Sequence, residues 1–114
     1  MSTAVTDRVL ECFAHKKVVV PDGLILPADN WNIQPGQSVF RVITPTDGDK
    51  RVVWNRGSIP DINAARKMFT DLVTAGMVPY RVGAGGQASS TVMDKFDPAA
   101  EEVIFMPMKA IAGG

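Results

Sequence analysis

The sequence of 114 residues predicts a small α+β fold, in which a mixed β-sheet packs against one main helix at residues 60–75. Three observations lead to this fold class. Two runs with alternating apolar and polar residues, 38–44 and 50–54, flank a turn, as in a β-hairpin. A capped stretch with helical periodicity follows them. Short apolar runs at 78–82 and 102–106 then supply further strands.

The hairpin is predicted from the alternation in its first strand and from its turn. Phe40 and Val42 fall on one face of a sheet, while Val39 and Ile43 fall on the other. An Asp-Gly pair precedes the second strand, 50–54, and this dipeptide between two such runs is a strong short-range hairpin signal.

The helix has start and stop signals as well as an apolar stripe. Ser58 is a typical N-cap, Pro60 suits the first turn and Asp61 stands where a capping box has its acidic residue. Gly76 provides a residue that can end the helix in a left-handed conformation. The residues that repeat at helical spacing, and that we expect to face the core, are Ile62, Ala65, Phe69, Leu72 and Val73.

The N-terminal third is expected to contain a short helix, at 3–15, because Val5, Val9, Cys12 and Phe13 fall on one helical face. After it, the Pro21-Asp22-Gly23 turn separates two apolar runs, 17–20 and 24–26, which predicts a short hairpin or two short extended pieces. Residues 27–37 form a loop, which Trp31 and Ile33 are expected to pin to an apolar surface.

The whole chain, 1–114, is predicted to form a single domain. Its β-β-α-β-β core spans 38–114, and 1–37 form an N-terminal extension of helix, hairpin and loop. Within the core, residues 92–96 are expected to be extended, and 97–100 to form a single helical turn before the last strand.

Composition and charge narrow the function classes. The chain is 46% hydrophobic and 21% charged, so it should fold, and its twelve basic and twelve acidic residues give zero net charge. It therefore lacks the positive field that drives nucleic-acid or anionic-membrane binding. Small clusters such as Lys50-Arg51 beside Trp54 are explained by packing across strands. We expect neither a nucleic-acid nor a membrane partner.

Localisation is predicted from the absence of targeting signals. No apolar run approaches the ~20 residues that cross a bilayer. The first residues, Met1-Ser2-Thr3, lack the basic and apolar regions of a signal peptide. Cytoplasmic synthesis is the expectation, and incorporation into a virus particle would be compatible with it.

Catalytic, cofactor and metal sites are not predicted. The chain holds one cysteine and one histidine, Cys12 and His15, which are too few for a zinc site and exclude an internal disulfide. A small hydrolase or transferase that uses Cys12 and His15 as a nucleophilic pair remains an alternative. Such a pair would still need an orienting group and an oxyanion hole. The glycine-rich loop 83–86 matches no phosphate-binding motif. The chain is predicted not to be an enzyme and to bind no cofactor.

The C-terminal part carries a family resemblance. Glu101-Glu102 precedes the apolar strand 103–106 and Pro107, and the sequence closes on Gly113-Gly114. With the order of elements over 38–114, this ending resembles the ubiquitin-like β-grasp sulfur-carrier proteins. The resemblance implies that the Gly114 carboxylate is adenylated and converted to a thiocarboxylate. It also implies that Gly113 is the small residue that threads into a partner's active site.

The function predicted first is a non-enzymatic structural or assembly protein, a small subunit that packs into a larger protein assembly such as a phage virion. It would form a homo- or hetero-oligomer, because apolar strands such as 17–20 and 103–106 can add to a neighbour's sheet edge. The alternative is the ubiquitin-like carrier, with Gly113 and Gly114 as its functional tail. The interface candidates of the assembly protein are Trp31, Ile33, Phe105 and Met106.

Overall fold

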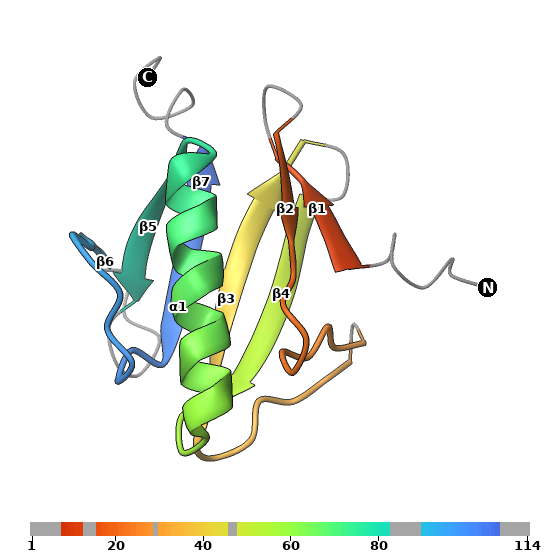
Figure 1. Ribbon diagram of the computed structural model, residues 1–114, viewed down its shortest axis with the longest axis vertical. Coiled ribbons are helices and arrows are strands. Elements are labelled where there is room, and N and C mark those ends of the chain that lie inside the picture. Colours follow the sequence, from red (N-terminus) through yellow and green to blue (C-terminus); the bar gives the residue numbers. More distant parts are fainter. Residues whose placement is uncertain (1–7, 13–15, 29, 46–47, 83–89, 108–114) are drawn as a thin grey trace.

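A computed structural model describes residues 8–12, 16–28, 30–45, 48–82 and 90–107, shown as coloured ribbon in Figure 1. These residues form seven strands and one helix, in the order β1 (Val9–Glu11), β2 (Lys17–Val19), β3 (Gln37–Thr44), β4 (Gly48–Asn55), α1 (Ile59–Thr74), β5 (Met77–Val82), β6 (Ser90–Val92) and β7 (Glu102–Pro107). The predicted class, a mixed sheet with one main packed helix, is confirmed.

The main sheet has five strands in the order β4-β3-β7-β5-β6. Strand β3 runs parallel to β7, and the other neighbouring pairs are antiparallel. The predicted hairpin is confirmed as β3 and β4, which pair from Gln37↔Asn55 to Thr44↔Gly48. Helix α1 crosses one face of this sheet, and the small β1–β2 sheet lies on the same side, beside the helix (Figure 1).

Helix α1 begins as the sequence predicts. The Ser58 hydroxyl accepts a hydrogen bond from the Asp61 backbone N–H, and Pro60 lies in the first turn. The chain leaves the helix through Gly76, whose φ of 97° is the left-handed conformation that glycine adopts without strain. Ala65, Phe69 and Leu72 of the predicted stripe are buried. Val73 differs, because its side chain lies at the flank of the helix and is 43% exposed.

Aromatic rings form the centre of the core between α1 and the sheet. Phe40 on β3 contacts Trp54 on β4 and Phe105 on β7 in edge-to-face geometry, with ring centroids 5.9 and 5.2 Å apart. Phe69 joins them from the helix, 5.6 Å from Phe105. Phe96, which follows β6, packs 5.6 Å from Trp54 and closes this layer.

The prediction of an N-terminal helix is wrong for the part that the structure describes. Residues 9–11 form strand β1, which pairs antiparallel with β2 through Val9↔Val19 and Glu11↔Lys17. Leu10 and Val18 thereby turn into the main core. Pairing between these strands decided the local structure against the helical spacing of the apolar residues. The remaining positions of the predicted helix, 3–7 and 13–15, lie outside the described residues.

Of the two alternatives predicted for residues 17–26, the structure shows two short extended pieces and not a hairpin. The first run is β2, whose partner is β1, and the second run contributes Ile25, which bridges to Val53 at the outer edge of β4. Of the predicted extended piece, only Val92 belongs to β6. Residues 97–100 form the single turn that was predicted, although it is not assigned as helix: the Ala100 N–H bonds to the Asp97 carbonyl, and the Asp97 side chain accepts from the Ala99 N–H.

Candidate protein-interaction surfaces

The second face of the main sheet, which we call the open face, is the one turned away from α1. Its residues follow from the alternation of each strand. Val103 and Phe105 of β7 belong to the core, so Ile104 and Met106 between and after them point to the open face. Directly opposed residues share a face, and Tyr80 pairs with Ile104 and with Val92.

An apolar patch occupies the half of the open face over β5, β6 and β7. Its members are all partly or largely exposed and lie outside the hydrophobic core cluster: Val78, Tyr80, Val82, Val92, Ile104 and Met106. Val92 is the most exposed of them, at 52%. Within the described part of the chain, no helix or strand packs over this patch. Apolar side chains that stay partly exposed beside one another on one face of a sheet are candidates for an interaction site.

The other half of the open face, over β3 and β4, is charged and partly covered. Arg41 bonds to Asp49 and Glu102, which form a small ionic network beside the apolar patch. Arg51 donates to the carbonyl oxygens of Ala28, at 3.0 Å, and Trp31, at 3.4 Å. These bonds hold the segment between β2 and β3 against β4. The two halves of the open face therefore differ in chemistry.

The two edges of the sheet also differ. At the β4 edge, Val53 exchanges two backbone hydrogen bonds of 2.8 Å with Ile25, and the Asn55 N–H donates to Asp61. At the β6 edge, the Met93 N–H donates to the Pro79 carbonyl. Because hydrogen-bonded pairs alternate along an antiparallel ladder, the backbone groups of Val92 point away from β5. No described strand pairs with them there.

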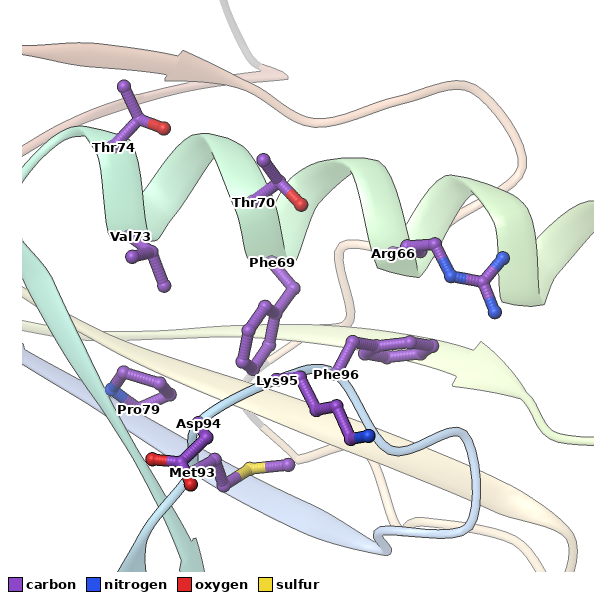
Figure 2. A pocket seen from close by; sticks show the side chains of 10 residues that line it. All are labelled: Arg66, Phe69, Thr70, Val73, Thr74, Pro79, Met93, Asp94, Lys95 and Phe96. Atoms are coloured by element: carbon purple, nitrogen blue, oxygen red, sulfur yellow. The ribbon is translucent and has the colours of Figure 1, made fainter.

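A groove lies on the helix side of the molecule, between α1 and residues 93–96 (Figure 2). It has a volume of about 480 Å³. Phe69 and Val73 project into it from the helix, and Pro79 and Met93 form its lower wall (Figure 2). The polar side chains at its rim are Arg66, Thr70, Thr74, Asp94 and Lys95.

Reactive and metal-binding groups are not assembled in the described residues. No three acidic, histidine or cysteine side chains there are placed to bind a metal ion. Cys12 is 1% exposed, and burial raises the pKa of its thiol, which keeps it in the unreactive neutral form. His15, its predicted partner in a nucleophilic pair, lies outside the described residues.

The four predicted interface residues lie in different environments. Met106 lies in the apolar patch. Phe105 is fully buried in the core, so its side chain cannot contact another protein. It differs from Met106 because neighbouring residues of a strand face opposite sides of the sheet. Ile33 is 38% exposed, whereas Trp31 is partly exposed with its indole nitrogen buried and unpartnered. Gly113 and Gly114 lie outside the described residues.

Sequence reasoning missed Val78, Tyr80, Val82 and Ile104 as surface residues. A signal was present, since these positions alternate with Pro79, Arg81 and Phe105. That alternation separates two faces but does not say which face the helix covers. The groove had no sequence signal, because its lining residues come from three separate parts of the chain.

Within the described residues, no helix has the length and apolar character needed to span a membrane. No protein-family model, curated protein or solved structure matches this chain. The resemblance of residues 38–114 to sulfur-carrier proteins therefore stays a prediction from the order of elements and the Gly113-Gly114 pair.

Proposed function

We propose that this chain is a non-enzymatic assembly subunit, which packs against further protein chains through the apolar patch on the open face of its sheet. The observation that carries this proposal is the patch itself: six apolar side chains on three adjacent strands, with no described element over them. Removing apolar surface of this kind from water contributes about 25 cal/mol for each Å², which offsets the entropy that two chains lose when they associate.

Two further features support an assembly role. The zero net charge leaves little repulsion between copies. The β6 edge, which borders the patch, presents the outward backbone groups of Val92, so a neighbouring strand can add to the sheet beside the apolar surface. A copy of this chain is the first partner to test, because the patch is then available on both molecules.

The experiment is the solution mass of the purified chain, measured by light scattering after size exclusion over a concentration series. We expect a defined oligomer or a larger particle in place of the 12.3 kDa monomer. Tyr80→Asp, on the middle strand of the patch, and Val92→Asp, at its edge, should shift the mass towards the monomer. A charge placed in an apolar interface must be desolvated without a partner.

The matched control is Ile59→Asp, because Ile59 is 67% exposed at the start of α1, away from the open face. It should leave the mass unchanged, and circular dichroism should show that all three variants are folded. A wild-type chain that stays monomeric and binds no apolar fluorescent dye would contradict the proposal. So would patch variants with the mass of the wild type.

A further inference from the structure

The groove between α1 and residues 93–96 combines an apolar floor with two cations, Arg66 and Lys95, that form none of the ion pairs among the described residues. It lies on the helix side of the sheet, opposite the apolar patch. Its floor holds Phe69, which is 5% exposed, together with the buried Pro79, while Val73 is 43% exposed at its wall. An apolar side chain of a ligand would therefore find apolar contacts on both walls.

The positive charges at this groove have no acidic partner among the described ion pairs. Arg41, Lys67 and Arg81 each bond to a carboxylate, at 2.7 to 3.0 Å. Neither Arg66 nor Lys95 belongs to any of those pairs. Two cations at the rim of one apolar groove favour a ligand that brings its own negative charge.

Arg66 is held in a defined position. Its Cζ lies 5.5 Å from the centre of the Phe96 ring, a cation–π contact, and its Nη1 donates to the Asn63 side chain at 3.3 Å. A guanidinium has five N–H donors, so this leaves donors for a carboxylate. Lys95 extends towards the same end of the groove, while Asp94 lies towards the Pro79 end (Figure 2). A carboxylate is thus favoured at the Phe96 end alone.

The shape of the groove favours an extended chain over a small molecule. A second hollow of about 510 Å³ lies along residues 91–98 and shares Met93, Asp94, Lys95 and Phe96 with the first. Both hollows are open to solvent rather than enclosed. Small-molecule sites instead enclose most of the ligand surface.

We propose that this groove docks an extended acidic segment of a partner protein. A bulky apolar side chain of that segment packs between Phe69, Val73 and Met93, and a neighbouring aspartate or glutamate binds Arg66 and Lys95. The groove shares no lining residue with the apolar patch, which only the adjoining hollow reaches, at Val92, and the proposal does not rest on assembly through that patch.

The test is a nuclear magnetic resonance titration of the full chain with a panel of short blocked peptides. Each peptide carries leucine, phenylalanine or tryptophan beside two acidic residues, and has a matched analogue with asparagine and glutamine in their place. We expect saturable shifts at the side-chain signals of Val73 and Met93. The neutral analogues should bind about tenfold more weakly, since a charge-assisted hydrogen bond contributes roughly this factor.

Two variants locate the site. Arg66→Gln should weaken binding of the acidic peptides by about tenfold, because it removes the stacked guanidinium. Lys67→Gln is the matched control: Lys67 is the adjacent residue, with a 69% exposed side chain that pairs with Asp71 at the hollow on the other flank of α1. It should change affinity less than about twofold.

Several outcomes would overturn the proposal. The first is the absence of saturable chemical-shift changes at the groove residues at millimolar peptide. The second is equal binding of the acidic and the neutral peptides. The third is a larger loss of peptide affinity from Lys67→Gln than from Arg66→Gln. Equal affinity for phenylacetate would also overturn it, because the groove would then be a small-molecule site. None of these readouts depends on the oligomeric mass, so failure here is distinguishable from failure of the proposed assembly.

Discussion

The guanidinium of Arg41 on β3 donates to the Glu102 carboxylate on β7 at 3.0 Å, and so ties together the two parallel strands of the sheet. A second nitrogen bonds Asp49 on β4 at 2.7 Å. The hydrogen bonds to Asp49 and then Glu102 raise the pKa of Arg41 above its already high ordinary value. This network marks the boundary between the charged half of the open face and the apolar patch.

Replacing Arg41 with glutamine should lower the free energy of unfolding by no more than about 1 kcal/mol, because pairs with exposed partners contribute little in water. The side chains of Arg41 and Asp49 are 39% and 36% exposed. Urea unfolding at low and high salt measures the effect, which should shrink as salt screens the charges. A loss several times larger, and insensitive to salt, would contradict the exposed character of this network.

Phe105 and Met106 test the assignment of the two faces. Phe105→Ala should lower the free energy of unfolding by about 3–5 kcal/mol, since it leaves a cavity among the core rings. Met106→Ala, one residue further on β7, should lower it by less than about 1 kcal/mol. Urea unfolding at low protein concentration compares them without a contribution from self-association. Equal losses would mean that Met106 is as deeply buried as Phe105, which would contradict the assignment of the open face.

The start of α1 depends on two polar side chains with different numbers of bonds. Ser58 accepts one bond, from the Asp61 N–H, and Ser58→Ala should lower the free energy of unfolding by about 1 kcal/mol. The Asp61 carboxylate accepts bonds from the backbone and side-chain nitrogens of Asn55, at 2.9 and 3.1 Å. Asp61→Ala should therefore lower the free energy of unfolding by more than Ser58→Ala does, by about 1–3 kcal/mol. Thermal unfolding measures both, and the exposed Thr70→Ala, expected within about 0.5 kcal/mol of the wild type, is the control.

The buried thiol of Cys12 should make the protein less stable at alkaline pH. Burial raises the folded-state pKa of its thiol above the ordinary value of 9.0, so the folded protein holds this proton more tightly than the unfolded chain. The stability that it contributes is complete below pH 9.0 and is lost as the pH rises towards the folded-state pKa. The free energy of unfolding of the wild type, measured in urea, should decrease as the pH rises in this range. Cys12→Ala, which has no thiol, should lack that part of the slope, and parallel slopes would disprove the prediction.

The elements that sequence reasoning located correctly are those whose signals are local. The hairpin of residues 37–55 is signalled in the sequence by an Asp-Gly pair, and helix α1 has its own capping residues, Ser58 and Gly76. The error at residues 9–11 has the opposite cause. Their apolar spacing fits one face of a helix, and only pairing with residues 17–19 makes them a strand. Contacts between segments override weak local preferences in such short stretches.

The candidate surfaces depend on strand order, which no local pattern specifies. Tyr80 and Ile104 become neighbours because β7 inserts between β3 and β5. Arg66 meets Phe96 because the segment after β6 returns across the helix flank. Phe105 and Met106 are adjacent in the sequence, and both were predicted to lie at an interface. Because α1 packs on the face that carries Phe105, Phe105 is a core residue and Met106 is a surface residue.

The bond between Ile25 and Val53 at the β4 edge limits how far the sheet can be extended by copies of itself. In the described residues, the outward backbone groups of Val53 at the β4 edge are bonded to Ile25, whereas no described strand pairs with those of Val92 at the β6 edge. Two molecules that join edge to edge through β6 would consume both available edges in a single step. The product would be a closed pair with a continuous ten-stranded sheet rather than a fibre, because the Ile25–Val53 bridge obstructs the β4 edge that a third molecule would need.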